Sequence, residues 1–114
     1  MTNNLDNKGN SMPVILLPKN VFGAFMSLAR EIESCGPLSK KEQELILLGT
    51  VVMDRSEHGI ALHAEKAYRA GATRNEILHA IVCCLPVAGL AKVNEALEAG
   101  LAAVDQLEKA AGGK

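Results

Sequence analysis

The chain contains no tryptophan, and only two phenylalanines and one tyrosine supply aromatic rings among its 114 residues. A core with so few rings has to be built from aliphatic side chains, and hydrophobic residues make up 48% of the sequence. Leucine, isoleucine, valine and alanine in such numbers are typical of a helical bundle. The length fits one domain that is large enough to bury a real core.

The chain also lacks an excess of either charge, since its net charge is −1. Without a basic run, nucleic acid and anionic membranes are not expected as main partners. No apolar run reaches the ~18 residues that a membrane span needs. The N-terminal segment lacks the hydrophobic stretch of a secretory signal, so we expect a cytoplasmic protein. The three cysteines, an odd number that includes an adjacent pair, do not resemble a secreted disulfide framework.

The pattern of apolar residues predicts an all-α fold of five helices, with no strand candidate. Residues 1–12 are polar and aperiodic and are expected to form a disordered leader, whereas residues 13–114 are expected to form a single domain. The first helix should begin after Pro18, with Asn20 as a possible cap, and end near Cys35. Its buried side would be lined by Val21, Phe22, Phe25, Met26, Leu28, Ala29 and Ile32.

The stretch 39–71 is predicted to form two helices joined by a polar elbow at residues 54–56. Ser39 and Glu42 have capping-box spacing, and Ser56 is a plausible N-cap for the second helix, which should stop at Gly71. The first of these helices is apolar around most of its circumference, so we expect it to be largely buried. Gly49 interrupts it and could mark the close approach of another backbone.

The last two helices are predicted at about residues 73–85 and 90–109. Thr73 and Glu76 again have capping-box spacing, and Pro86 and Gly89 mark a break between the two helices. The fourth helix is apolar nearly all round, which is typical of a helix that is central or buried between subunits. One chain of this size can hardly cover so much apolar helix surface, so we predict a homo-oligomer.

Glu44 and His63 are the first candidates for chemistry, because an antiparallel pair of helices would bring them toward each other. A carboxylate held by an imidazole in an apolar pocket can transfer protons near neutral pH. The same pair could instead be a buried salt link that positions two helices. The sequence permits either role.

The elbow and the start of the last helix supply the candidate binding residues. Ser56, Glu57 and His58 could line the mouth of a pocket, or form an ordinary solvated helix start. Asn94 and Lys92 follow the break at residues 86–89, where a helix start could hold an anionic group. A polar first turn would explain them equally well.

Neither a redox role nor a metal site is favoured by the remaining candidates. Cys83 and Cys84 are neighbours on a helix, where side chains point apart, so packed thiols are expected rather than a disulfide. His58 and His63 are five residues apart and not four, and we therefore expect no metal site. Acid–base chemistry at Glu44 and His63 would also need no cofactor.

The stretch 39–71 resembles the core of the carboxymuconolactone decarboxylase and alkylhydroperoxidase D superfamily. That family has a glutamate, an elbow, C-x-x-C-x-x-x-H, and then a glycine eight residues after the histidine. Glu44, His63 and Gly71 fall on the glutamate, the histidine and the glycine, whereas the two cysteine positions hold Ser56 and Gly59. The similarity spans residues 19–108, and residues 89–94 resemble the G-x-P-x-x-N of the decarboxylase branch.

The resemblance implies a five-helix bundle of the alkylhydroperoxidase D type that assembles as a homotrimer or a homohexamer. It also implies a site at Glu44 and His63 near a subunit boundary, and a small organic acid or lactone as the substrate. The family's proline, tyrosine and histidine correspond to Ala91, Val87 and Cys83. Because positions 56 and 59 lack the cysteines of the redox branch, we expect a decarboxylase-like lyase or isomerase. The alternatives are a peroxidase that uses Cys83 or Cys84 and a non-catalytic oligomeric binding protein.

Overall fold

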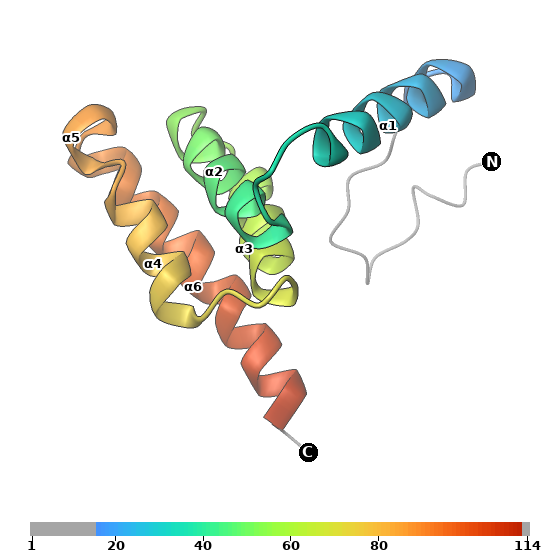
Figure 1. Cartoon of the computed structure of the whole chain (residues 1–114). Coiled ribbons are helices and arrows are strands. Elements are labelled where there is room, and N and C mark those ends of the chain that lie inside the picture. Colours follow the sequence, from blue (N-terminus) through green and yellow to red (C-terminus); the bar gives the residue numbers. More distant parts are fainter. Residues whose placement is uncertain (1–15, 113–114) are drawn as a thin grey trace. The chain divides into compact units, whose positions relative to one another are not determined.

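The computed structural model describes residues 16–112, and every regular element in that range is a helix. The described residues form five helices of nine or more residues and a single helical turn, α5 (Figure 1). The predicted all-α fold and its five main helices are thus confirmed. The predicted leader at residues 1–12 lies outside the described residues, and the extent of the single domain stays a prediction. The chain divides into two compact units, of which one ends at Gly36 and the other begins at Pro37.

Helix α1 (Lys19–Ser34) is the regular element of the first unit. Pro18 is its N-cap and no side chain caps it, so the predicted cap at Asn20 is wrong, because Asn20 already lies inside the helix. No residue of α1 is buried, and Phe25 is 57% exposed. The prediction of a buried side therefore fails for the single chain. Among the described residues of its unit, α1 has no second helix on which to pack that side.

The second unit begins with the predicted helix pair, α2 (Lys40–Met53) and α3 (Glu57–Arg69). Ser39 and Glu42 form the predicted capping box, and the Ser56 hydroxyl accepts the predicted N-cap hydrogen bond. Between the two helices Arg55 adopts a positive φ of 58°, which is uncommon for a residue with a side chain. Gly71 follows α3 with a φ of 106°, the conformation that favours glycine after a helix end.

The unit is completed by α4 (Arg74–Val82), the one-turn α5 (Leu85–Ala88) and the long α6 (Leu90–Gly112). Helix α6 packs against both α3 and α4, and α2 packs against α3 and α4. Thr73 and Glu76 form the predicted capping box at the start of α4. The aliphatic core lies among these helices and comprises Leu48, Val52, Ile60, Ala64, Ala67, Ala72, Ile77, Ile81, Val93, Ala96 and Val104.

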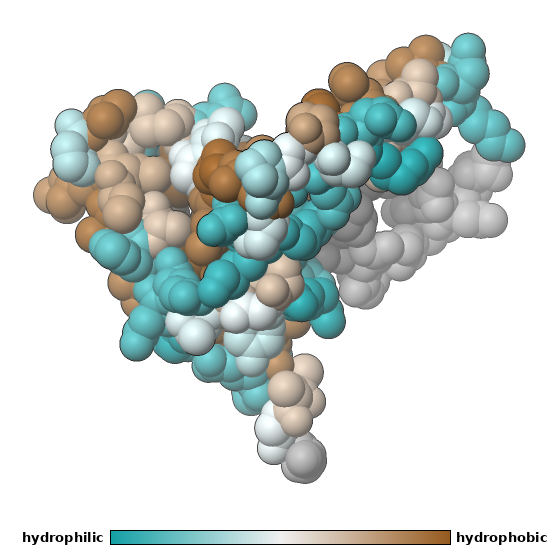
Figure 2. Space-filling view, viewed as in Figure 1, coloured by the Kyte–Doolittle hydropathy of each residue, from teal (hydrophilic) through white to brown (hydrophobic). Residues whose placement is uncertain are grey.

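Helices α2 and α4 are less buried than their apolar composition predicts. In α2 the buried residues are Glu44, Leu48 and Val52, whereas Ile46 is 55% exposed. Within one chain only one stripe of each helix meets a neighbouring helix, so the rest of the apolar surface stays uncovered. Figure 2 shows such apolar surface gathered over the end of the bundle at α5.

One smaller expectation also changes. The group that approaches Gly49 is a side chain and not a backbone, because a Cβ at that position would lie 3.5 Å from the Cys84 sulfur. Across the described residues, no helix is both long and apolar enough to cross a membrane.

Candidate active site at Glu44 and His63

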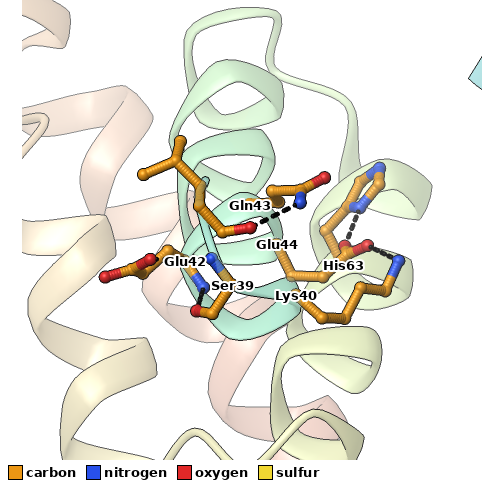
Figure 3. Close-up of polar contacts among 7 residues, drawn as sticks. Ser39, Lys40, Glu42, Gln43, Glu44 and His63 are labelled. Carbon is orange, nitrogen blue, oxygen red and sulfur yellow. Dashed lines mark hydrogen bonds and ion pairs between the residues drawn. The ribbon is translucent and has the colours of Figure 1, made fainter. Parts of the chain in front are cut away.

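Glu44 and His63 are in direct contact. The Nδ1 atom of His63 lies 2.8 Å from Oε1 of Glu44, and the contact joins α2 to α3 (Figure 3). Glu44 is the buried charged residue of the core, at 2% exposure. The side chain of His63 keeps 18% of its surface exposed. The two residues that the sequence permits to meet therefore do meet, with the carboxylate inside and the imidazole at the edge of the core.

Lys40 is a third member of the group, which the sequence analysis missed. Its Nζ lies 2.8 Å from Oε2 of Glu44, the oxygen that His63 leaves free. Lys40 stands four residues before Glu44 in the same helix, and this is a spacing at which opposite charges pair on a helix surface. That spacing was the available signal. It was obscured because Lys41, the next residue, is an equally plausible partner by sequence.

The electrostatics of Glu44 follow from these two contacts. Burial raises the pKa of the Glu44 carboxyl, but the hydrogen bonds from Lys40 and His63 outweigh burial, so the pKa lies below its ordinary value of 4.5. Glu44 is therefore ionised at neutral pH. An ionised carboxylate only accepts hydrogen bonds, so Nδ1 of His63 must carry the proton that it donates.

The second ring nitrogen of His63, Nε2, remains open. Figure 3 shows it pointing away from the Glu44 carboxylate. Among the described residues, Nε2 makes no hydrogen bond. Since no described side-chain nitrogen or oxygen is both buried and without a partner, Nε2 reaches the surface of the chain. With the proton on Nδ1, a neutral imidazole presents a lone pair on Nε2, which is the arrangement of a general base.

The elbow beside this pair cannot hold two thiols without a change in structure. The Ser56 hydroxyl accepts a hydrogen bond from the Gly59 backbone N–H at 3.0 Å and is thereby used as the helix cap. A Cβ at position 59 would lie 2.8 Å from the Ser56 oxygen and 3.0 Å from Cγ1 of Val51. Real Cβ atoms essentially never show the first distance, and the second is tighter than nine in ten of their contacts. The two positions where the family has cysteines are thus occupied by a helix cap and by a glycine that lies close to the side chains of Ser56 and Val51.

Two of the candidate binding residues, Glu57 and Lys92, lie at a cavity of about 410 Å³ between the elbow and α6. Arg55, Glu95 and Glu98 line the same cavity. The Arg55 guanidinium binds the Glu95 carboxylate through Nε and Nη2, at 2.8 and 2.9 Å. Lys92 donates a longer hydrogen bond of 3.4 Å to the Met53 carbonyl oxygen, so its ammonium group keeps donors for another partner.

The remaining candidates are separate from both places. His58 and Asn94 are exposed, and neither is among the residues that line the cavity. Glu44 and His63 do not line it either. The chain therefore brings Glu44 and His63 together at one point, with Lys40, and brings Glu57 and Lys92 together at another.

The cysteines and histidines form no larger cluster. Cys83 is exposed, contrary to the expectation of a packed thiol, because it lies at the end of α4 where the helix leaves the core. Cys84 is half-buried, and burial raises the pKa of its thiol, which disfavours the reactive thiolate. Across residues 16–112, no group of three or more histidine, cysteine, aspartate or glutamate side chains is arranged to hold a metal ion.

Comparison with known proteins gives one match. The model of the carboxymuconolactone decarboxylase family matches residues 19–102, which is well over half of the chain. No match was found among curated proteins or among solved structures. The matched range contains both Glu44 and His63.

The lowered pKa of Glu44 predicts how acid affects stability. A carboxyl whose pKa is lowered in the folded state adds stability above the ordinary pKa of 4.5, and this stability is lost as the pH falls through the lower folded value. Glu44→Gln removes the titration, so its free energy of unfolding should fall less steeply than that of the wild type below pH 4.5. Urea unfolding at a series of pH values measures both slopes.

Glu57→Gln, which changes an exposed glutamate outside the pair, is the matched control and should keep the wild-type slope. Equal slopes for Glu44→Gln and the wild type would show that the Glu44 carboxylate is not held in ionised form by the fold.

Proposed function

The protein belongs to the carboxymuconolactone decarboxylase family, and we propose that it performs cofactor-free acid–base chemistry on a small organic acid or lactone. One observation carries the proposal. The imidazole of His63 is fixed through Nδ1 by a buried carboxylate, while Nε2 is left open to the surface. That geometry suits a proton transfer at a carbon next to a carbonyl group.

In the proposed reaction, Nε2 takes a proton from the carbon, and the electron pair of the broken C–H bond moves into the neighbouring carbonyl. The imidazolium that results is stabilised by Glu44, whose carboxylate remains ionised 2.8 Å from Nδ1. Return of the proton to a different carbon completes an isomerisation. In a decarboxylation, CO₂ leaves, the electron pair of the broken C–C bond moves into the neighbouring carbonyl, and Nε2 of His63 takes a proton from water and passes it to the carbon.

We propose Lys92 as a contact for the negative group of an acid at the cavity, which within one chain is separate from His63. Asn94, Ser56, Glu57 and His58 stay proposed binding residues on the strength of the sequence. Support for Lys92 comes from its place at the cavity and from its single long hydrogen bond. An ammonium with donors to spare can bind a carboxylate.

Self-association is the second part of the proposal, as a trimer or a hexamer. The support is the amount of apolar side-chain surface that one chain leaves exposed. In the second unit the exposed large apolar residues are Leu38, Ile46, Leu47, Met53, Val82, Leu85, Val87 and Leu90. Such surface also favours the other candidate function, a non-catalytic oligomeric binding protein.

The catalytic proposal predicts a measurable exchange of carbon-bound hydrogen. In D₂O, the wild-type protein should exchange the hydrogens next to the carbonyl of one or more small keto acids or lactone acids, as followed by proton NMR. His63→Gln should lower the exchange rate by a factor of roughly 10²–10⁴, the usual contribution of a general base.

His79→Gln, which changes an exposed histidine on α4, is the matched control and should exchange at the wild-type rate. Exchange that survives in His63→Gln would contradict the proposal. No exchange with any acid of the panel would favour the non-catalytic alternative.

The peroxidase alternative predicts a role for cysteine that our proposal does not. Without thiols at positions 56 and 59, and with the Cys84 pKa raised by burial, we expect no thiol-dependent reduction of peroxide. Replacing Cys83 and Cys84 with serine together should therefore leave the consumption of hydrogen peroxide, in the presence of a dithiol reductant, at the wild-type level. A loss of consumption in the double variant would revive the peroxidase alternative.

Self-association predicts that a charge on the exposed apolar surface separates the subunits. Ile46→Lys should lower the molar mass in solution, measured by light scattering, because a lysine at an interface core would be desolvated without a partner. The control is Gln106→Lys, which adds the same charge at an exposed polar position of α6. Helicity should be unchanged in both variants. A wild-type protein that is a monomer would refute the prediction.

A further inference from the structure

Both oxygens of the Glu44 carboxylate are occupied, each by a different kind of partner. Oε1 accepts from an imidazole that can be neutral or charged, and Oε2 accepts from the Lys40 ammonium, which is charged at neutral pH. The carboxylate side chain is 3% exposed, whereas the Lys40 side chain is 47% exposed. Lys40 therefore reaches in from the surface to a charge that water barely touches.

A buried carboxylate needs a positive partner, because an uncompensated charge in the interior is strongly destabilising. If His63 were the sole partner, the imidazole would be driven to take a second proton and supply that charge itself. The second proton would sit on Nε2, and Nε2 could not then act as a base. With Lys40 supplying the charge, His63 has only to donate one hydrogen bond and can remain neutral.

Several other charged groups of the second unit pair with one another, whereas Lys66, three residues after His63 on α3, is exposed and forms no ion pair with Glu44. On α4, Glu76 binds Lys41 of α2. On α6, Glu95 binds Arg55. On α3, Glu65 binds Arg69, and Arg74 of α4 binds Asp105 and Glu108 of α6. Among the described residues, Lys40 is thus the one lysine or arginine hydrogen-bonded to Glu44.

We propose that Lys40 is a positioning residue that keeps the His63 imidazole neutral and its Nε2 free by supplying the positive charge that Glu44 requires. The catalytic meaning of this role rests on the proposed function, but the charge balance itself does not. Without the ammonium, the Glu44–His63 pair should take up its additional proton at a higher pH. Because the two groups are coupled, this proton uptake belongs to the pair.

The test is a pH titration of the imidazole signals by long-range ¹H–¹⁵N NMR, which reports the proton on each ring nitrogen and needs no substrate. Lys40→Met should move the pH midpoint of the His63 signals upward by about one unit, a tenfold change in proton affinity, as expected when a charge within ~4–6 Å is removed. Lys40→Arg, which keeps the charge, should restore the wild-type midpoint. Lys40 is half exposed, so the substitutions should not prevent folding.

Lys41→Met is the matched control, because Lys41 stands next in the same helix and binds Glu76 instead. It should leave the His63 midpoint where it is in the wild type. A wild-type midpoint in Lys40→Met would overturn the proposal. If Lys40→Met were unfolded, Lys40→Gln would replace it, because glutamine keeps a hydrogen-bond donor but loses the charge. The same upward shift of the His63 midpoint would then be expected, and a wild-type midpoint would overturn the proposal.

The role can also be separated from the proposed function. If the wild-type protein exchanges carbon-bound hydrogen, Lys40→Met should shift the acid limb of the pH–rate profile of exchange to higher pH. At alkaline pH the exchange rate of the variant should equal that of the wild type. A merely structural lysine would lower the rate at every pH. A shifted NMR midpoint together with no exchange in any acid would support Lys40 and reject the proposed function.

Discussion

The carboxylate of Glu44, buried among aliphatic side chains, is the constraint on which the centre of this protein depends. Burial of a charge is tolerated only where hydrogen bonds and opposite charge compensate it. Here an ammonium on one oxygen and an imidazole on the other provide both, and they come from two helices. The requirement therefore fixes how α2 lies against α3, and at the same time fixes which nitrogen of His63 faces outward.

The elbow between α2 and α3 is the reason that we propose acid–base chemistry and not thiol chemistry. This elbow uses Ser56 as a helix cap, and a Cβ at Gly59 would lie only 2.8 Å from the Ser56 oxygen. The polar group that remains available near the pair is the open nitrogen of His63. This chain thus has the glutamate and the histidine of the family but not its two cysteines. The proposed proton transfer by His63 requires no thiol.

Much of the fold could be predicted from the sequence, because it follows from local rules. The capping boxes at Ser39 and Thr73, and the glycine that ends α3, depend on residues within a few positions of one another. Burial was harder to predict, since it depends on how many neighbours cover a helix. The apolar sides of α1, α2 and α4 predicted burial that one chain does not supply.

Some features of the candidate site could also be predicted from the sequence, and others could not. The contact of Glu44 with His63 could be anticipated from the antiparallel pair, together with the family resemblance. Lys40 could not be chosen over Lys41, because both lysines stand within one turn of Glu44 and only the rotation of the helix decides which one reaches it. The separation of Glu57 and Lys92 from His63 could not be predicted either, since it depends on where α6 crosses the elbow.

A crystal structure of the assembled protein, examined at His63, would test the central claim most directly. The account predicts that Nδ1 stays within hydrogen-bond distance of Glu44 while Nε2 faces a solvent-filled pocket large enough for a small acid. An Nε2 atom sealed beneath the side chains of a neighbouring subunit, or a pair that has separated, would contradict it. The Glu44–His63 contact would then be a structural link between two helices.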